Sequence, residues 1–359
     1  MFLKKINHSP KEDKNKDKLV QKISISLKRT NIIKGLAILA VIFVHVLAYF
    51  PGIYQSQKQL LFISLDQLAR FCMPAFIMLS GYGLAFKYEQ KEIYYFAFLK
   101  NRIWKLLPLY LLWSFYSILI IKSVPAWSFG NQPMSLIIQI LFGQADYQLY
   151  FLPVIFQLYL LFPLIWFLRK KPNFMLILAI IMQAVTYYIF SFEVTSSDRF
   201  QYVLFLSWIA YFVFGIYLKL AIIPKIIIKM IWPLTIIAFA VMTFSSLQQI
   251  NSGLDPLPAL KFTRLIVIPF GLLINFGLAT LKTPFKENKN IFSVLLTWLG
   301  KNSYIIFLSH TIGLRIIHTA INNKLELYPL LAVIFSWLIV IFFSQKFLLT
   351  KKIKTVIND

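Results

Sequence analysis

Ten apolar runs, each about long enough to cross a bilayer, dominate this chain of 359 residues. A transmembrane α-helix needs roughly 20 predominantly apolar residues. Hydrophobic residues make up 59% of the chain and charged residues 14%, against roughly 25% charged residues in an average soluble domain. A water-soluble globule cannot bury so much apolar surface, so the sequence predicts an all-α polytopic membrane bundle of about ten transmembrane helices. The runs lie near residues 31–50, 61–86, 105–121, 148–168, 174–192, 201–221, 226–245, 263–281, 302–322 and 327–348.

Basic residues outnumber acidic residues by 37 to 13, which gives a formal net charge of +24. In a soluble chain this excess would suggest nucleic-acid binding. Here the cations lie between the apolar runs, and the cytoplasmic loops of membrane proteins are enriched in Lys and Arg. With the N-terminus inside, 29 of the 37 fall on the cytoplasmic side, seven fall on the outer side, among them Arg315, and Arg70 lies within a span. The pattern predicts that both termini lie inside, and no nucleic-acid partner is expected.

Three segments follow from these patterns. Residues 1–28 are polar and basic and are predicted to form a disordered cytoplasmic tail. Residues 29–350 form the predicted ten-helix membrane domain, and residues 351–359 form a short cytoplasmic tail. Two further apolar segments, 134–142 and 291–300, are too short to span a bilayer and are expected at the membrane interface.

Several kinds of chemistry find no support in the sequence. The single cysteine, Cys72, excludes an internal disulfide, and no His/Cys spacing suits a metal site. No phosphate loop, zinc-protease motif or dinucleotide motif is present. The small residues at 80–83, Ser-Gly-Tyr-Gly, are expected to allow close helix packing. Reactive groups are expected inside the bundle or at its two mouths, because the predicted outer loops, the longest at about 122–147, are too short to hold a folded domain.

Four ionisable side chains within the predicted spans are candidates for function, because such groups are costly in a bilayer. They are His45, Asp66, Arg70 and His310. Asp66 and Arg70 are one helical turn apart and can form an ion pair that fixes packing; alternatively, Arg70 points into a cavity. Taken alone, each histidine is either a hydrogen-bonded packing residue or a functional one.

Cations near the cytoplasmic ends of the spans can also be read in two ways. Lys34 lies eleven residues before His45, which returns it to within about 20° of the same helix face, roughly 16 Å away. Lys100, Arg102 and Lys105 precede the third span. These cations are either topology anchors or a site for the phosphates of a ligand.

Five motifs together resemble the acyltransferase-3 family of membrane-bound acyltransferases. The first is the Lys34–His45 spacing, where the family has Arg, ten residues and His. The others are similar to its F-x-x-S-G-Y, R-x-x-R-L-x-P-x-Y, L-W-F-L and S-Y-x-x-Y-L-x-H stretches, and they lie at residues 76–82, 102–110, 149–152 and 303–310. The resemblance covers about residues 29–348, and the motifs occur in the family's order.

Three positions depart from the family pattern. Lys34 replaces the usual Arg, Tyr150 replaces a Trp, and Thr311 replaces the Pro that often follows the late His. A Lys keeps the positive charge of an Arg but lacks its bidentate geometry.

The resemblance implies transfer of an acyl group, usually acetyl from acetyl-CoA, to a hydroxyl of a sugar or another cell-envelope acceptor. It also implies a multi-pass protein of the bacterial inner (plasma) membrane. Acyl-CoA would then be a co-substrate, with no permanently bound cofactor and no metal. The expected partners are the lipid bilayer, acyl-CoA and a glycan or lipid-linked sugar.

These expectations give each candidate a role. His45 is the general base, or it carries the acyl group covalently. Arg70 stabilises the developing oxyanion or orients a carboxylate. His310 orients His45 or binds the acceptor, although the rise per residue places the two histidines at different depths unless a helix tilts or kinks. The phosphates of CoA are held by Lys34, Arg102 and Lys105.

Two other classes of protein share this architecture. A polysaccharide exporter or flippase would move glycan without consuming acyl-CoA. A noncatalytic membrane scaffold would tolerate substitution of His45 and Arg102 without any change in phenotype.

Overall fold

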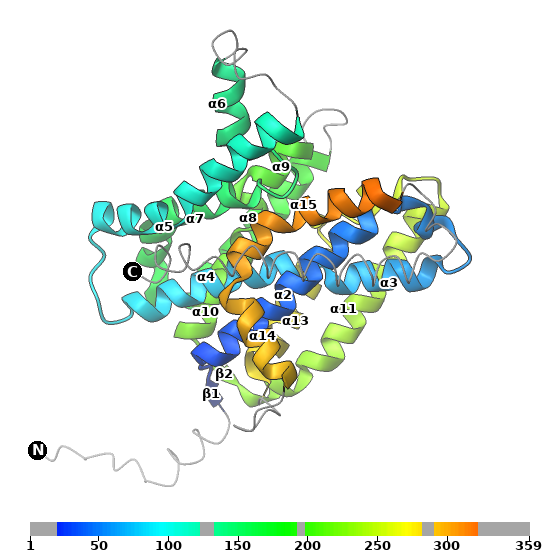
Figure 1. Ribbon diagram of the computed structural model, residues 1–359. Helices are drawn as coiled ribbons and strands as arrows, with labels where there is room; N and C mark the ends of the chain where they lie inside the picture. The colour runs from blue at the N-terminus through cyan, green and yellow to red at the C-terminus, as the bar shows by residue number, and fades with distance from the viewer. Residues whose placement is uncertain (1–19, 123–132, 192–197, 282–290, 322–359) are drawn as a thin grey trace, which may run out of the picture.

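The computed structural model describes residues 20–122, 133–191, 198–281 and 291–321, and these form a bundle of helices (Figure 1). The helices are α2 (Leu27–Ala48), α3 (Gln59–Ala69), α4 (Cys72–Tyr88), α5 (Tyr95–Tyr116), α6 (Pro133–Leu141), α7 (Phe151–Phe167), α8 (Pro172–Ser191), α9 (Asp198–Val203), α10 (Ile209–Leu220), α11 (Lys225–Asn251), α12 (Pro256–Ala259), α13 (Val267–Thr280), α14 (Ile291–Lys301) and α15 (Ser303–Ile321). Short helical turns are η1 (Pro51–Gln55), η2 (Ser117–Ile121), η4 (Leu168–Lys170) and η5 (Phe205–Ser207). Strands β1 (Val20–Lys22) and β2 (Ile222–Pro224) pair antiparallel.

Six helical segments are long and apolar enough to cross a membrane, and the bent pair α14–α15 would make a seventh. The six are Leu27–Ala48, Gln59–Tyr88, Tyr95–Ile121, Phe151–Lys170, Pro172–Ser191 and Lys225–Asn251. The prediction of an all-α membrane bundle is confirmed, whereas ten full-length spans are not found in the described part of the chain. The shorter helices α10 and α13 stand where spans were predicted at 201–221 and 263–281. The last predicted span, 327–348, lies outside the described residues.

The predicted span at 201–221 is interrupted because the side chain of Gln157, on α7, satisfies the backbone there. Its Nε2 donates to the carbonyl of Val203 over 2.9 Å, and its Oε1 accepts from the amide of Phe205 over 3.1 Å. Backbone can leave helical geometry at membrane depth only where protein groups supply its hydrogen bonds. Helix α9 therefore ends at Val203, and α10 begins at Ile209 after the turn η5.

Glycines allow two pairs of helices to cross at very short range. A Cβ atom at Gly35 or at Gly300 would overlap a backbone carbonyl of the opposite helix, so α2 and α14 meet backbone to backbone. Gly81 and Gly215 play the same part where α4 crosses α10. Small residues at such crossings let membrane helices pack closely. The close packing predicted for residues 80–83 is confirmed at Gly81.

The short segments are placed as follows. Helix α6 has nine residues, which is too few to span a bilayer and agrees with the prediction for residues 134–142. It projects from the top of the bundle in Figure 1. Residues 291–300 belong to α14, which packs against α2 and buries Leu296 and Leu299; this segment is part of the helical core. The predicted tail, residues 1–28, includes strand β1 and the start of α2. Residues 1–19 and 351–359 lie outside the described residues.

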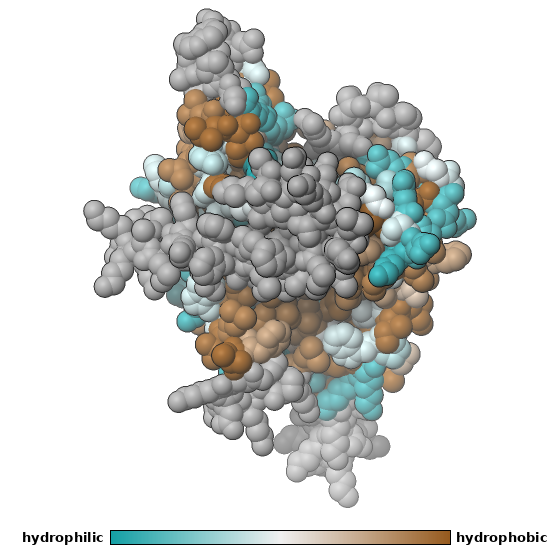
Figure 2. Space-filling model, turned by 45° about the vertical axis from the view of Figure 1, so that its right-hand side comes forward, coloured by the Kyte–Doolittle hydropathy of each residue, from teal (hydrophilic) through white to brown (hydrophobic). Residues whose placement is uncertain are grey.

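In Figure 2, apolar side chains gather in the lower half of the face, and hydrophilic side chains gather towards its right and lower edges. Large apolar side chains are exposed along α8 and α11, including Ile177, Ile181, Ile236 and Val241. In water such a surface would be an aggregation hazard. It is the surface expected where lipid covers the helices.

Candidate functional site

The two histidines of the predicted site lie against one another, with His45 in the last turn of α2. Nδ1 of His45, on α2, lies 2.6 Å from Nε2 of His310, on α15. The rings are stacked, with centroids 4.9 Å apart and an angle of 5° between their planes. The depth difference expected from straight helices does not occur, because α14 and α15 are bent by 88° at Asn302.

The hydrogen bonds of His310 determine which nitrogen of each neutral ring carries a proton. Nδ1 of His310 lies 2.7 Å from the carbonyl oxygen of Phe307 and 3.2 Å from that of Ile306. A carbonyl oxygen can only accept a hydrogen bond, so Nδ1 of His310 is the donor and its Nε2 is an acceptor. Nδ1 of His45 must then donate to His310. This leaves Nε2 of His45 unprotonated, as a general base requires.

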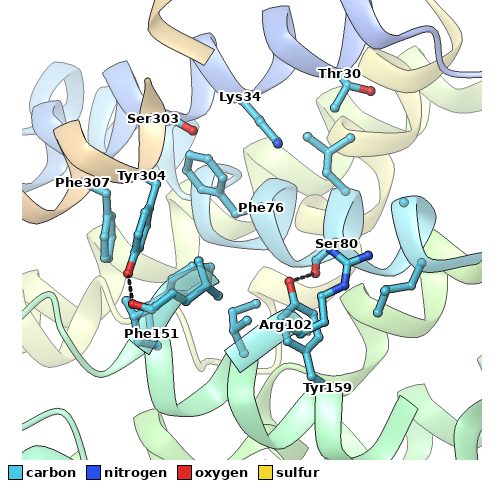
Figure 3. A pocket seen from close by; sticks show the side chains of 16 residues that line it. Thr30, Lys34, Phe76, Ser80, Arg102, Phe151, Tyr159, Ser303, Tyr304 and Phe307 are labelled. Carbon is cyan, nitrogen blue, oxygen red and sulfur yellow. Dashed lines mark hydrogen bonds between the residues drawn. The ribbon is translucent and has the colours of Figure 1, made fainter. Parts of the chain in front are cut away.

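A first cavity, which we call the basic cavity, has a volume of about 420 Å³ and lies among α2, α4, α5, α7 and α15 (Figure 3). Lys34 and Arg102 point into it from opposite walls. The guanidinium of Arg102 lies 5.8 Å from the ring of Tyr159, whose hydroxyl accepts from Ser80 over 2.9 Å. The remaining lining residues are Thr30, Phe76, Leu79, Gly83, Leu84, Leu106, Phe151, Leu152, Ile155, Ser303, Tyr304 and Phe307.

The cations predicted to hold phosphates separate in the structure. Lys34 and Arg102 line the basic cavity, and no Asp or Glu of the described chain lines it. Lys105 is exposed and does not line the cavity. The positive charge of this cavity therefore comes from two side chains, one on α2 and one on α5.

A second cavity, which we call the tyrosine cavity, has a volume of about 460 Å³ and lies between η2, the segment before α7, α9 and α15. Three tyrosines, Tyr147, Tyr150 and Tyr202, line it together with Asp146 and Arg315. The other lining residues are Ile121, Lys122, Phe142, Gly143, Gln144, Ala145 and Val203.

The histidine pair is connected to both cavities through aromatic contacts. Phe307 lines the basic cavity, and its ring centroid lies 6.1 Å from that of His310. Tyr147 lines the tyrosine cavity, and its ring meets that of His45 edge-on with centroids 4.9 Å apart. The histidine pair thus has one aromatic neighbour in the lining of each cavity, although neither histidine itself lines either cavity.

Sequence reasoning missed the polar group that anchors α15 beside the tyrosine cavity. Asp146 accepts hydrogen bonds from both terminal nitrogens of Arg315, at 2.6 and 2.9 Å. Gln148 and Thr311 also donate to this carboxylate, over 3.2 and 3.4 Å. Arg315 was predicted in an outer loop, but it lies within α15. The available signal was the spacing of its partners: Thr311 follows His310 directly, and Arg315 lies one helical turn after Thr311.

Arg70 does not line either cavity within the described chain. Its Nε and Nη2 donate to the carboxylate of Asp66 over 2.7 and 2.9 Å, and the hydroxyl of Tyr54 donates to the same carboxylate over 3.0 Å. The guanidinium also lies 4.4 Å from the centre of the Phe262 ring. Of the two alternatives that the sequence left open for this pair, the structure shows the ion pair.

Comparison with known proteins identifies the family of the chain. A family model described as an acyltransferase domain matches residues 28–344. The chain belongs to the acyltransferase-3 family. It is therefore an acyltransferase, and its apolar helices make it a multi-pass membrane protein. No curated protein and no solved structure matches the chain.

Proposed function

We propose that this acyltransferase moves an acyl group from acyl-CoA to a hydroxyl of a cell-envelope glycan or a related acceptor in the bacterial inner membrane, and that the acyl group is acetyl. The observation that carries the proposal is the unprotonated Nε2 of His45, which the chain of hydrogen bonds through His310 imposes. A hydroxyl is a poor nucleophile at neutral pH, and a positioned imidazole can take its proton in the transition state.

In the one-step reaction, His45 carries the proton from the acceptor hydroxyl to the thiolate of CoA. The acceptor oxygen attacks the thioester carbonyl, a C–O bond forms, and its proton passes to Nε2 of His45. The tetrahedral intermediate then collapses, the C–S bond breaks, and the imidazolium returns the proton to the thiolate of CoA. In a two-step variant, Nε2 of His45 attacks the thioester carbonyl, the C–S bond breaks and CoA leaves as the thiolate. The acceptor oxygen then attacks the acyl carbon, the C–N bond to His45 breaks, and the hydroxyl proton passes to the freed Nε2 and from there to the thiolate.

The basic cavity suits the donor. CoA carries several phosphate charges, and Lys and Arg are the side chains that bind phosphates. Lys34 and Arg102 supply two cations there, and no Asp or Glu lines this cavity among the described residues. The N-in orientation that the charge bias favours would open this end of α2 to the cytoplasm, where acyl-CoA is found. Lys105 does not line the basic cavity, so we assign it only to the excess of basic residues on the predicted cytoplasmic side.

His310 acts in this proposal as a positioning residue, because it fixes the ring orientation and tautomer of His45. Arg70 is held by Asp66 at the junction of α3 and α4, so we assign it to the stability of that junction rather than to the oxyanion. Neither role needs a metal or a bound cofactor.

The proposal is tested by mass spectrometry of envelope glycans from cells with and without the protein, together with CoA release by the purified protein. Acyl groups on a glycan that disappear with the gene, and CoA release that depends on a hydroxyl acceptor, are the expected results. Glycan export without any consumption of acyl-CoA would instead support the exporter and overturn the proposal.

A further inference from the structure

The two cavities that flank the histidine pair differ in charge. The basic cavity has Lys34 and Arg102 in its lining, without a carboxylate from the described chain. In the tyrosine cavity Arg315 is neutralised by Asp146 at 2.6 Å, and the Lys122 ammonium donates to Gln139 and to the Gln144 carbonyl, at 2.7 and 2.8 Å. The cations of the tyrosine cavity are thus engaged by the protein itself, and this cavity is poorly suited to an anion.

The chemical character of the tyrosine cavity is aromatic and hydrogen-bonding. An aromatic ring packs against the C–H face of a sugar, and a tyrosine adds a hydroxyl at its edge. Tyr147 is 43% exposed and the side chain of Arg315 is 30% exposed, so a ligand can reach both.

The position of Tyr147 relates this cavity to the reaction. Its ring lies edge-on to His45 at 4.9 Å, while the guanidinium of Arg315 lies 5.6 Å from the same ring. His45 itself does not line the cavity, so a ligand packed beside Tyr147 would lie one aromatic ring away from the imidazole. The volume of about 460 Å³ lies within the range of small-molecule sites, roughly 300–1,000 Å³.

We propose that the tyrosine cavity is the acceptor site and that it takes an uncharged sugar ring in preference to an acidic one. The proposal rests on the function proposed above and adds the location and the charge class of the acceptor. Tyr147 is the platform for the ring, and the Asp146–Arg315 pair is the specificity determinant. A sugar carboxylate would be repelled by Asp146 and would have to compete with it for Arg315, whereas neutral hydroxyls can bond to the pair without separating it.

The experiment measures sugar binding without turnover, in the full chain in lipid nanodiscs, by saturation-transfer NMR. The probes are methyl glycosides of glucose, galactose, mannose and N-acetylglucosamine, each compared with its uronic acid, which differs by one carboxylate. At least one neutral glycoside is expected to bind about tenfold more tightly than its acid. Binding should weaken about tenfold in Tyr147→Leu and persist in Tyr147→Phe, which keeps the ring face.

Three results would overturn the proposal. These are no binding by any neutral glycoside, equal or tighter binding by the acids, and binding that Tyr147→Leu leaves unchanged. Asp146→Asn provides a second variant if Tyr147→Leu fails to fold, and it should narrow the gap between glycoside and acid. Because binding is measured without acyl-CoA, a protein that binds neutral sugars but never releases CoA would contradict the proposed function and leave the site intact.

Discussion

Replacing His310 tests whether it acts by accepting a hydrogen bond from His45. In His310→Phe a flat ring still fills the space of the stacked imidazole, but Nδ1 of His45 loses its acceptor at 2.6 Å. His310→Gln keeps an oxygen that can accept the same bond. The two variants therefore separate the loss of the acceptor from the loss of packing.

The size of the effect follows from one buried hydrogen bond. Leaving its donor unpaired costs about 1–3 kcal/mol, and each 1.36 kcal/mol in the activation barrier is about tenfold in rate. His310→Phe is thus expected to lower kcat roughly 5- to 150-fold, with little change in KM for acyl-CoA, since His310 does not line the basic cavity. His310→Gln should recover much of the lost rate.

The assay is CoA release detected with a thiol reagent, on purified variants whose thermal unfolding in detergent matches that of the wild type. A normal kcat in His310→Phe would show that His310 does not position His45. Equal loss in both variants would show that the hydrogen-bond acceptor is not what matters.

Other predictions concern the proposed donor site, the helix crossing and the ion pairs of Glu89. Lys34→Gln should raise KM for acyl-CoA about tenfold, because one charge-assisted contact is lost. Lys34→Arg should keep KM near the wild-type value, and the exposed Lys105→Gln should change KM less than about twofold. Equal KM values for Lys34→Gln and wild type would contradict the donor assignment. Gly300→Ala should destabilise the protein by about 1–3 kcal/mol in thermal unfolding and lower kcat, because α14 must move away from α2. Gly52→Ala, with open space around it, should change neither stability nor kcat. Equal stability of the two variants would refute the close crossing of α2 and α14. Hydrogen bonds from Lys219 and Lys22 lower the pKa of Glu89, so its contribution to stability, about 0.5–1 kcal/mol, is present above the unfolded carboxyl pKa of about 4.3 and is lost as the pH falls further. The difference in unfolding temperature between wild type and Glu89→Gln should therefore be visible at pH 7 and vanish near pH 3; a difference that stays constant with pH would exclude this ion pair as its cause.

The sequence predicts the membrane class of the fold well, because long apolar runs and the charge bias are local properties. It predicts the number of full spans poorly. The break after Val203 depends on Gln157, which lies in another helix and supplies the hydrogen bonds of the interrupted backbone. No pattern within residues 201–221 reveals that partner.

The candidate site shows the same division. His45 and Lys34 could be assigned to one helix face from their spacing alone. The contact between His45 and His310 could not be predicted, because the 88° bend of α14 and α15 depends on tertiary packing, in which Gly35 and Gly300 bring α2 and α14 together. A cap at Asn302 or Ser303 is visible in the sequence, but the direction that the next helix takes is not.

Asp146 was missed for a different reason. A single acid in a connecting segment has no periodicity, and its importance comes from partners on α15 that are 165 and 169 positions away in the chain. Arg70 shows the opposite case, since its partner Asp66 lies one turn away and was visible from the sequence.

The most direct test of the central claim is the initial rate of CoA release by purified His45→Ala with acetyl-CoA and a hydroxyl acceptor. It is compared with wild type and, as the matched control, with His8→Ala, which replaces a histidine of the predicted N-terminal tail. If Nε2 of His45 is the base, the rate in His45→Ala falls at least about 100-fold while acetyl-CoA still binds and His8→Ala is unaffected. A rate within about twofold of wild type in His45→Ala, which corresponds to a barrier change of about 0.4 kcal/mol, would contradict the account.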